Sequence, residues 1–370
     1  MKTLVALCPY VAYRNEQLLK DCVLIPYSFT NLGYQVRLVT ARKEEFTYLK
    51  YLPKLKIDEA PLVPEEDWAT YLLNYLKNYQ GQIDRLFCFG LREAYGPVIS
   101  YFKEHFDGKV ILKLDANSYW MDIINYQATP YQEIIAACDL ISCEGQAMQS
   151  YLAKKWKRPI DLIRNGFPLA TFESELDFKQ KENIILNVGS QESERKNSPA
   201  LIKAFASQAE KFPDWQLVLI GNYTPEVELL VKAYQQRNPQ LKRQLKLLGP
   251  IADKKLLESY YAKAKIFVTA SYLEGGSPNV VAEALRNGCY LITSKIDAWQ
   301  DTFAKGAGAS FDHGDLAALE ANMRQVMSEP QLSQRAFELN RAYALAELPY
   351  EKQVLRLESL LKVRGQINGK

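Results

Sequence analysis

The residue types best suited to chemistry lie together in Ser271-Tyr-Leu-Glu-Gly-Gly-Ser-Pro-Asn-Val-Val-Ala-Glu-Ala-Leu285. This segment follows an apolar run, Ile266–Ala270, and leads into a helix predicted over Asn279–Arg286. Glycines let a backbone approach a ligand closely, and the amides at a helix N-terminus attract phosphate. The carboxylates of Glu274 and Glu283 are suited to accept hydrogen bonds from sugar or ribose hydroxyls. The segment therefore predicts a site for a ligand that carries both a diphosphate and hydroxyl groups.

An ordinary strand-to-helix loop is the alternative interpretation of this segment. In that case Ser277 caps the helix and Glu283 is solvated, because Gly-rich turns are common in proteins of every function. Pro278 suits the first turn of the helix, where its missing donor costs little.

Strands and helices alternate along the chain and thereby place this segment. Short apolar runs in the first half predict buried parallel strands at Lys2–Cys8, Tyr34–Thr40, Arg85–Phe89, Lys109–Leu114 and Leu140–Cys143. A helix is predicted over about Glu16–Asn31, which Gly33 ends. The alternation restarts near residue 183, with strands predicted at Asn183–Val188, Trp215–Ile220, Leu245–Leu248, Ile266–Ala270 and Tyr290–Thr293.

This pattern predicts an α/β protein of two doubly wound, Rossmann-like domains, because 370 residues exceed one ordinary core. We place an N-terminal domain at residues 1–165, a second domain at 166–348, and a terminal helix at 349–370 that packs back toward the first domain. Ligands bind at the carboxyl ends of parallel strands, so we expect the site in the cleft between the domains.

Composition excludes several classes of function. The net charge of +3 is too small to indicate nucleic-acid binding. The chain has only two histidines and no Cys-x-x-Cys pair, which argues against a zinc site. Its six cysteines are interpreted as buried apolar residues. No run approaches the roughly 20 apolar residues that span a bilayer, and no signal peptide is recognisable. We expect a cytoplasmic protein, with peripheral attachment to the inner face of the membrane as an option.

The sequence resembles the retaining glycosyltransferases of family 4, which have the GT-B fold. The resemblance rests on Glu274-Gly275, Pro278-Asn-Val-Val281, Glu283-Ala-Leu285 and Asn287-Gly288. Eight residues separate the two glutamates here, whereas the family usually has seven. Leu248-Gly-Pro-Ile251, Ile163-Arg-Asn-Gly-Phe-Pro168 and Ala307-Gly308 extend the likeness, which is strongest over residues 138–330.

The resemblance implies roles for residues of the second domain. Glu283 is expected on the ribose, Glu274 on the transferred sugar, and the backbone of Pro250 and Ile251 at the nucleobase. Lys196 matches the family lysine that neutralises the diphosphate, while Ser190 stands where the family has arginine. Arg195 supplies that missing charge in one interpretation, and in the other Arg195 and Lys196 are solvated surface cations. The remaining predicted donor-binding residues are Asn222, Tyr272, Gly275, Gly276, Ser277, Pro278, Asn279 and Val280.

The first domain is expected to bind the acceptor. Tyr13, Arg14 and Asn15, in a loop predicted after the first strand, can hydrogen-bond sugar hydroxyls, and Asp115 and Asn117 follow another strand. Asp115 falls where the family often has a residue facing the reacting carbon, and we include it with Glu274 and Lys196 as a catalytic candidate. The alternative to an acceptor-binding role is a solvated surface loop at Tyr13–Asn15. For Asp115 the alternative is a turn that its side chain caps.

Two stretches mix basic and aromatic residues, Arg42–Lys56 and Tyr151–Arg158. Such mixtures suit an anionic membrane surface, and they equally suit a solvated face.

These observations predict transfer of a sugar from a nucleoside diphosphate sugar, with UDP favoured, to a carbohydrate, glycan or lipid-linked acceptor. The family implies retention of configuration and no metal, and surface polysaccharide or glycoconjugate synthesis is the expected setting. No other cofactor is expected. Two alternatives stay open: a non-catalytic glycosyltransferase-like subunit of a partner enzyme, which the uncharged Ser190 favours, and a nucleotide-sugar 2-epimerase.

Overall fold

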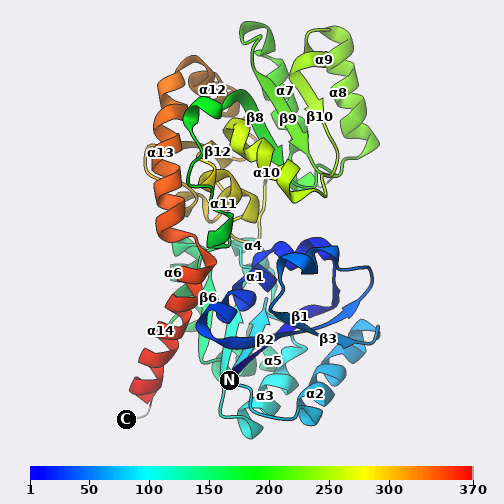
Figure 1. Cartoon of the computed structure of the whole chain (residues 1–370), viewed down its shortest axis with the longest axis vertical. Helices are drawn as coiled ribbons and strands as arrows, with labels where there is room; N and C mark the ends of the chain where they lie inside the picture. The colour runs from blue at the N-terminus through cyan, green and yellow to red at the C-terminus, as the bar shows by residue number, and fades with distance from the viewer. Residues whose placement is uncertain (193, 369–370) are drawn as a thin grey trace. The chain divides into compact units, whose positions relative to one another are not determined.

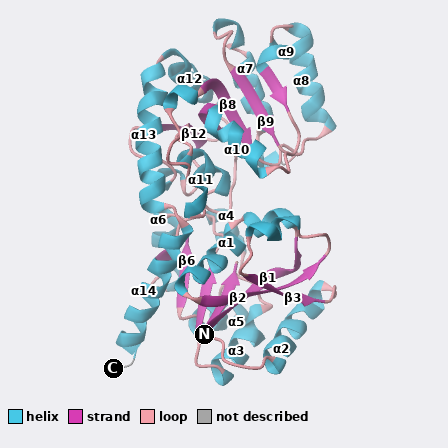
Figure 2. Ribbon diagram, viewed as in Figure 1, coloured by secondary structure: helices cyan, strands magenta, loops and turns pink. Residues whose placement is uncertain are grey.

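The computed structural model describes residues 1–192 and 194–368, with side chains at the C-terminal end as far as Arg364. The chain divides into two compact units (Figures 1 and 2). Unit 1 comprises Met1–Leu169 together with Pro349–Lys370, and unit 2 comprises Ala170–Leu348. The first change of unit therefore falls after Leu169, whereas the sequence places it after residue 165.

Unit 1 contains a parallel sheet in the order β3-β2-β1-β4-β5-β6-β7. Its strands are β1 (Lys2–Tyr13), β2 (Tyr34–Arg42), β3 (Leu55–Ala60), β4 (Arg85–Phe89), β5 (Lys109–Lys113), β6 (Leu140–Cys143) and β7 (Asp161–Leu162). The central strands are apolar along their whole length because helices cover both faces of such a sheet.

The helices of unit 1 come from both ends of the chain. They are α1 (Asp21–Ser28), α2 (Trp68–Asn78), α3 (Tyr95–His105), α4 (Ser118–Ile123), α5 (Thr129–Ala137), α6 (Gln146–Trp156) and α14 (Tyr350–Asn368). Helix α14 packs against α1, and its Val354 and Leu357 are fully buried in the core of unit 1. The Arg85 guanidinium also donates two hydrogen bonds, of 2.7 and 3.0 Å, to the Glu358 carboxylate.

Strand β1 is longer than its sequence pattern predicts. It extends to Tyr13 through a register irregularity, and Ala12 and Tyr13 pair with Ala41 and Arg42 of β2. Tyr13 is therefore part of a strand rather than a loop, and only 1% of it is exposed. Its hydroxyl lies inside the core and is not presented to a sugar hydroxyl, so this structure does not support the acceptor role predicted for Tyr13.

Unit 2 contains a second parallel sheet, in the order β10-β9-β8-β11-β12-β13. Its strands are β8 (Glu182–Val188), β9 (Gln216–Ile220), β10 (Leu245–Leu247), β11 (Ala264–Thr269), β12 (Tyr290–Ser294) and β13 (Gly308–Phe311). The strand order reverses direction between β8 and β11. The carboxyl ends of these two strands are therefore the topological switch point of the sheet.

The helices of unit 2 are α7 (Ser198–Ala206), α8 (Pro225–Arg237), α9 (Leu241–Gln244), α10 (Lys254–Lys263), α11 (Asn279–Arg286), α12 (Leu316–Ser328) and α13 (Pro330–Glu347). Helix α11 has the bounds that the sequence predicts. Its Val281, Ala284 and Leu285 are buried, whereas Asn279 and Glu283 are partly exposed. One face of α11 is thus fixed to unit 2, and the other is open to a ligand. None of the helices in the described part of the chain is both long and apolar enough to cross a membrane.

Candidate donor-binding site

Two loops leave the switch point of unit 2. One follows β8 and contains the 3-10 turn Glu194–Lys196, and the other follows β11 and leads into α11. The backbone N–H of Tyr272 donates to the carbonyl of Arg195 at 2.7 Å, which ties the two loops together. The two motifs that the sequence singles out therefore meet at one place in the fold.

Lys196 and Glu274 form an ion pair across the switch point. The Lys196 Nζ lies 2.6 Å from the Glu274 Oε1, and the two side chains are 22% and 11% exposed. This pair brings together the two charged residues that the sequence places on the diphosphate and on the sugar. Because both are largely shielded from water, their attraction is stronger than that of a surface pair.

Backbone contacts between glycines shape the edge of the sheet beside this pair. The Gly189 N–H donates to the Ile220 carbonyl at 2.9 Å, and the Gly221 N–H donates to the Gly249 carbonyl at the same distance. A Cβ atom at Gly221 would lie 1.7 Å from the Gly189 carbonyl oxygen, so no other residue fits there. The ends of β8, β9 and β10 are thereby held close together.

A buried amide network fixes the loop after β8. The Gln191 side-chain amide, only 2% exposed, donates to the Asn187 Oδ1 at 2.7 Å and to the Ile220 carbonyl at 3.1 Å. The Ser198 hydroxyl donates to the Gln191 Oε1, and the Asn187 amide donates to the Val268 carbonyl at 2.8 Å. This network joins β8, β9, β11 and the start of α7. Sequence analysis did not select Gln191 or Ser198, because only the packing of neighbouring strands shows their role.

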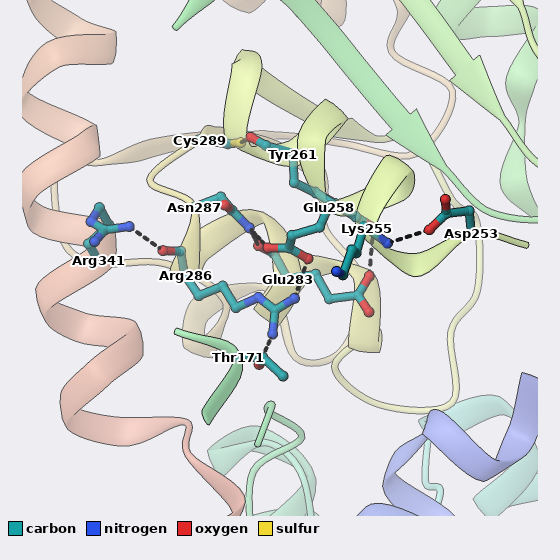
Figure 3. A network of polar contacts seen from close by, with 10 residues as sticks. All are labelled: Thr171, Asp253, Lys255, Glu258, Tyr261, Glu283, Arg286, Asn287, Cys289 and Arg341. Atoms are coloured by element: carbon teal, nitrogen blue, oxygen red, sulfur yellow. Dashed lines mark hydrogen bonds and ion pairs between the residues drawn. The ribbon is translucent and has the colours of Figure 1, made fainter. Parts of the chain in front are cut away.

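Glu283 projects from α11 and accepts a hydrogen bond from a buried tyrosine. The Tyr261 hydroxyl, on α10, donates to the Glu283 Oε2 at 2.7 Å (Figure 3). Burial raises the pKa of Tyr261 well above its usual range, and the Glu283 charge adds to this shift, so the hydroxyl keeps its proton. Within the described part of the chain, the other carboxylate oxygen of Glu283 has no partner. That oxygen can accept a hydrogen bond from a ligand hydroxyl.

The start of α11 differs from the sequence expectation at Pro278 and Ser277. Pro278 is the N-cap residue, one position before the first helical turn, and Ser277 does not cap the helix. Gly276 has a φ of 122°, a conformation that glycine adopts readily. Gly275, Ser277, Asn279 and Val280 are partly exposed, so the turn is accessible. The first amides of any α-helix lack intrahelical acceptors, which suits this turn to a phosphate.

A polar clamp on the inner side of α11 holds Glu283 in place (Figure 3). The Asn287 amide donates to the Glu258 Oε1 at 2.7 Å and to the Glu283 carbonyl at 2.9 Å. Arg286 forms an ion pair with Glu258, and Arg341 of α13 donates to the Arg286 carbonyl at 2.9 Å. Glu258 and Tyr261 belong to α10 and lie well before α11 in the chain, so the sequence offers no local signal for them.

The other predicted donor-binding residues surround the ion pair less closely. The Ser190 hydroxyl donates to the exposed Glu192 carboxylate at 3.0 Å. Arg195 is exposed, and it contributes its carbonyl rather than its charge to the link between the loops. The side chains that remain open to solvent at the nearby strand ends are those of Asn222, Pro250, Ile251 and Tyr272, with Ile251 partly covered.

Unit 1 places its predicted site residues at the end of β5. Asp115 is exposed. Asn117 is 1% exposed and is the N-cap of α4, where its Oδ1 accepts from the Trp120 N–H at 2.8 Å. The helix cap is therefore Asn117 and not Asp115, and the amide predicted to bind the acceptor instead holds α4.

The loop after β1 presents Arg14, whereas Asn15 has a structural role. Arg14 is exposed at the start of a 3-10 turn, Asn15–Leu19. The Asn15 amide donates to the Thr47 hydroxyl at 3.0 Å, and its Oδ1 accepts from the Tyr48 N–H at 2.9 Å. Asn15 therefore connects this turn to the segment after β2.

A fully buried ion pair lies beneath Asp115. Lys113 and Glu144 are 0% exposed and pair directly, and the Lys113 ammonium also donates to the Leu114 carbonyl at 3.0 Å and the Asn165 Oδ1 at 3.3 Å. Burial raises the pKa of Glu144, which the Lys113 charge opposes. The sequence gave no reason to select either residue, since each lies in an apolar strand context and their partners are distant in the chain.

The aromatic residues of the two basic stretches are mostly buried or packed against neighbours, although Tyr51 is 45% exposed. Phe46 and Tyr48 are 5% and 7% exposed, and Trp156 packs edge-on against Tyr126 with ring centroids 5.2 Å apart. The Lys155 ammonium donates to Asp122 at 2.8 Å.

Among the described residues, no group of three or more His, Cys, Asp or Glu side chains is arranged to hold a metal ion.

A comparison with protein families gives a match for the unit that holds the ion pair. Residues 170–342 match the model of the family described as glycosyl transferases group 1. This segment is similar to group 1 glycosyl transferases. The match covers most of unit 2, including the loops after β8 and β11. No curated protein matches the chain at a significant level.

Solved structures resemble the whole chain. Sucrose-phosphate synthase from Thermosynechococcus elongatus matches with a TM-score of 0.72 and 18% identity, over 100% of each chain. Anabaena HepE in complex with UDP matches with a TM-score of 0.73 and 15% identity, over 98% of this chain and 100% of that chain. WaaG, a glycosyltransferase involved in lipopolysaccharide biosynthesis, matches with a TM-score of 0.67 and 15% identity, over 96% and 99%.

At these identities the likeness is one of fold. The fold is GT-B, with two Rossmann-like parallel-sheet domains, which confirms the sequence prediction of fold and family resemblance. The family segment and the fold together support glycosyl transfer as the general activity.

Proposed function

We propose that this protein transfers a sugar from a nucleoside diphosphate sugar, with UDP as the favoured nucleotide, to a carbohydrate, glycan or lipid-linked acceptor. The Lys196–Glu274 ion pair at the switch point of unit 2 is the observation that carries this proposal. It joins a cation suited to a diphosphate with a carboxylate suited to a sugar, beside the open turn before α11. HepE, which shares the fold, has been solved with UDP and with UDP-glucose.

Each residue of the site has a proposed task during transfer. Lys196 stabilises the charge that builds on the leaving diphosphate, together with the backbone N–H groups of Gly276, Ser277 and Asn279. Glu283, held by Tyr261, accepts a hydrogen bond from the ribose. Glu274 orients the sugar, and the backbone of Pro250 and Ile251 borders the nucleobase. No metal is required in this proposal because Lys196 and the amides meet the charge.

The proposed reaction exchanges one bond at the anomeric carbon for another on the same face. The bond from this carbon to the β-phosphate oxygen breaks, and the bond to the acceptor oxygen forms with retention of configuration. The acceptor proton passes to the departing phosphate oxygen. Asp115 and Arg14 of unit 1, both exposed, are the side chains that we propose for acceptor contacts.

A non-catalytic role has one observation in its favour. Ser190 carries no charge, and its hydroxyl is directed to Glu192 rather than to a ligand. In this second candidate function the chain binds a nucleotide but stabilises an active partner enzyme. Lys196 would then hold the nucleotide diphosphate without any bond being broken.

Binding and turnover together test the two functions. Thermal unfolding is measured with UDP, GDP, ADP and dTDP, because a ligand of the native state raises the midpoint. We expect the largest shift with UDP. Release of UDP from UDP-glucose, UDP-galactose and UDP-N-acetylglucosamine is then measured with and without simple sugar acceptors. Nucleotide binding without release from any of these donors would support the non-catalytic function, and no binding at all would reject both.

Membrane attachment is proposed only as an electrostatic contact. Lys43, Lys50, Lys54 and Lys56 are all exposed, whereas the neighbouring Phe46 is buried. Such a contact weakens as salt rises. Sedimentation with anionic liposomes at low and high salt tests it, and we expect binding at low salt alone. Surface polysaccharide or glycoconjugate synthesis, in which lipid-linked acceptors occur, is the setting that we propose.

A further inference from the structure

A cleft of about 580 Å³ lies in unit 1, and none of the residues proposed for donor or acceptor binding lines it. Strands β2 and β3 and the C-terminal half of α2 border it, together with the turn after α2. Helix α2 lies between the parallel strands β3 and β4 in the chain, so it runs back toward the edge where the strands begin. The loops that carry Arg14 and Asp115 leave the opposite edge. Asp58 and Glu59, near the end of β3, also line the cleft, but neither Arg14 nor Asp115 does.

Aromatic rings and carboxamides make up most of the cleft lining. Tyr71, Tyr75 and Tyr79 are partly exposed there, and Asn74 and Asn78 are exposed on the same stretch of α2. The Tyr75 and Tyr79 ring centroids are 5.8 Å apart. One face of Tyr71 stacks on Trp68 and the Arg37 guanidinium lies over the Tyr79 ring, so a ligand would meet the opposite faces of these two rings. Tyrosine rings offer flat apolar faces, whereas carboxamides both donate and accept hydrogen bonds. This combination matches a ligand with apolar ring faces and many neutral hydroxyl groups.

The charged groups of the cleft are already neutralised. The Arg37 Nε donates to the Asp58 Oδ2 at 2.6 Å in a two-point contact, and the Tyr75 hydroxyl donates to the same oxygen. Glu59 pairs with Arg42 at 3.2 Å. Burial raises the pKa of Tyr75, and Asp58 raises it further, so this tyrosine remains neutral. An anionic ligand would have to break the Arg37–Asp58 contact, and an apolar ligand would leave the carboxamides and hydroxyls without partners.

We propose that this cleft is a second carbohydrate-binding site that holds a neutral oligosaccharide. The tyrosine rings stack on sugar rings, and Asn74, Asn78 and Gln80 exchange hydrogen bonds with the hydroxyls. The site binds a glycan without transferring a sugar to it, since its lining contains none of the residues proposed for donor or acceptor binding. The inference goes beyond the proposed function and does not depend on nucleotide binding.

A double variant, Asn74→Ala/Asn78→Ala, tests this site. Alanine is the better helix former, so the exposed face of α2 loses its amides without a loss of helix stability. Lys77→Ala is the matched control, because this exposed residue lies on the same helix but does not line the cleft. Binding of maltohexaose, cellohexaose and hexa-N-acetylchitohexaose to the full chain is measured by calorimetry, with an oligogalacturonate as the anionic comparison.

We expect at least one neutral hexasaccharide to bind, with a Kd that rises at least tenfold in the double variant and is unchanged in Lys77→Ala. The proposal is overturned if no neutral hexasaccharide binds, if the double variant binds equally well, or if the oligogalacturonate binds more tightly. The UDP-induced thermal shift is measured on the same samples. Its absence would count against the proposed function alone, because the cleft lies in unit 1 and the nucleotide site in unit 2.

Discussion

Lys196 and Glu274 neutralise each other before any donor is present, and this has a consequence for the order of events in the site. In the function that we propose, a diphosphate that contacts Lys196 competes with Glu274 for the same ammonium group. When the ammonium turns to the phosphates, the Glu274 carboxylate becomes available to sugar hydroxyls. Recognition of the diphosphate and recognition of the sugar are thereby linked through one ion pair.

The substitution Lys196→Ala should separate binding from folding. We expect the UDP-induced thermal shift to disappear and UDP release to fall by roughly 100- to 1000-fold, the scale of losing one group that stabilises a developing charge. Lys203→Ala is the control, since Lys203 is an exposed lysine on the adjoining α7. If Lys196→Ala binds UDP as well as the parent protein, Lys196 does not contact the diphosphate.

The role of Glu283 can be tested by nucleotide affinity, without a measurement of activity. Replacing a charged hydrogen-bond acceptor by Glu283→Ala should cost about 1.5–3 kcal/mol in UDP binding, a tenfold or larger rise in Kd. The parent protein should also prefer UDP over 2′,3′-dideoxy-UDP, and Glu283→Ala should bind the two nucleotides equally.

Tyr261→Phe is the companion variant, because it keeps the ring but removes the hydroxyl that holds Glu283. It should reduce the preference for UDP without abolishing it. A full preference for UDP in Glu283→Ala would place the ribose elsewhere.

Loops at the ends of strands, more than helices, set the geometry of the donor site. Gly189, Gly221 and Gly249 allow three strand ends to approach through backbone hydrogen bonds alone. The loop that carries Lys196 starts directly after Gly189, so its position depends on this approach. A side chain at the closest contact would therefore move the ion pair as well as the sheet edge.

Gly221→Ala should consequently be among the most destabilising single substitutions in unit 2. Its Cβ would meet the Gly189 carbonyl, and the residue would keep a φ of 131°. Gly314→Ala is the control, because Gly314 also has a positive φ, 79°, but no atom within 4 Å of the added Cβ. Urea unfolding should show a loss of about 1–2 kcal/mol for Gly314→Ala and clearly more for Gly221→Ala. Equal losses would show that only backbone conformation matters at Gly221.

Sequence patterns predicted the elements of unit 2 better than the contacts between them. Helix α11 and the strands β8, β9 and β12 fall within two residues of their predicted ends, because their apolar runs are bounded by glycine or charge. Strand β3 was missed, since Leu55–Ala60 lies at the sheet edge and alternates with charged residues. Tyr13 was assigned to a loop because Pro9 and polar neighbours follow the first apolar run.

Local sequence motifs also predicted only some of the side chains of the candidate site. Lys196, Glu274 and Glu283 were selected from local motifs, and the structure places the first two in contact. Gln191, Glu258 and Tyr261 were not selected, because their partners come from other strands and helices. Their role depends on the tertiary packing of β8 with β9 and of α10 with α11, which one sequence does not reveal.

At the scale of the whole molecule, unit 1 is built from two distant parts of the chain. Tyr350, Val354, Leu357 and Leu361 of α14 belong to the core that residues 1–169 form. Unit 2, by contrast, is a single uninterrupted segment. Stability of the first unit therefore depends on a helix that follows the second.

Leu357→Ala should destabilise unit 1 by about 2–5 kcal/mol, the usual cost of truncating a buried leucine. Leu355→Ala is the control on the same helix, because Leu355 is 56% exposed whereas Leu357 is 0% exposed. We expect hydrogen exchange to accelerate in β1, β4 and α1 with Leu357→Ala and to remain unchanged in unit 2. Faster exchange in both units would mean that they unfold as one.

Because unit 1 combines the two ends of the chain, the order of synthesis affects its folding. During synthesis the segment 1–169 leaves the ribosome first, but it lacks the apolar residues of α14 until the chain has passed Leu361. Unit 2 has all of its own residues earlier, so it can complete its core before the N-terminal unit does. The surface of α1 that α14 covers in the folded protein therefore stays uncovered until a helix about 180 residues later is translated. A chaperone that shields this surface would act on the N-terminal unit while the C-terminal unit folds.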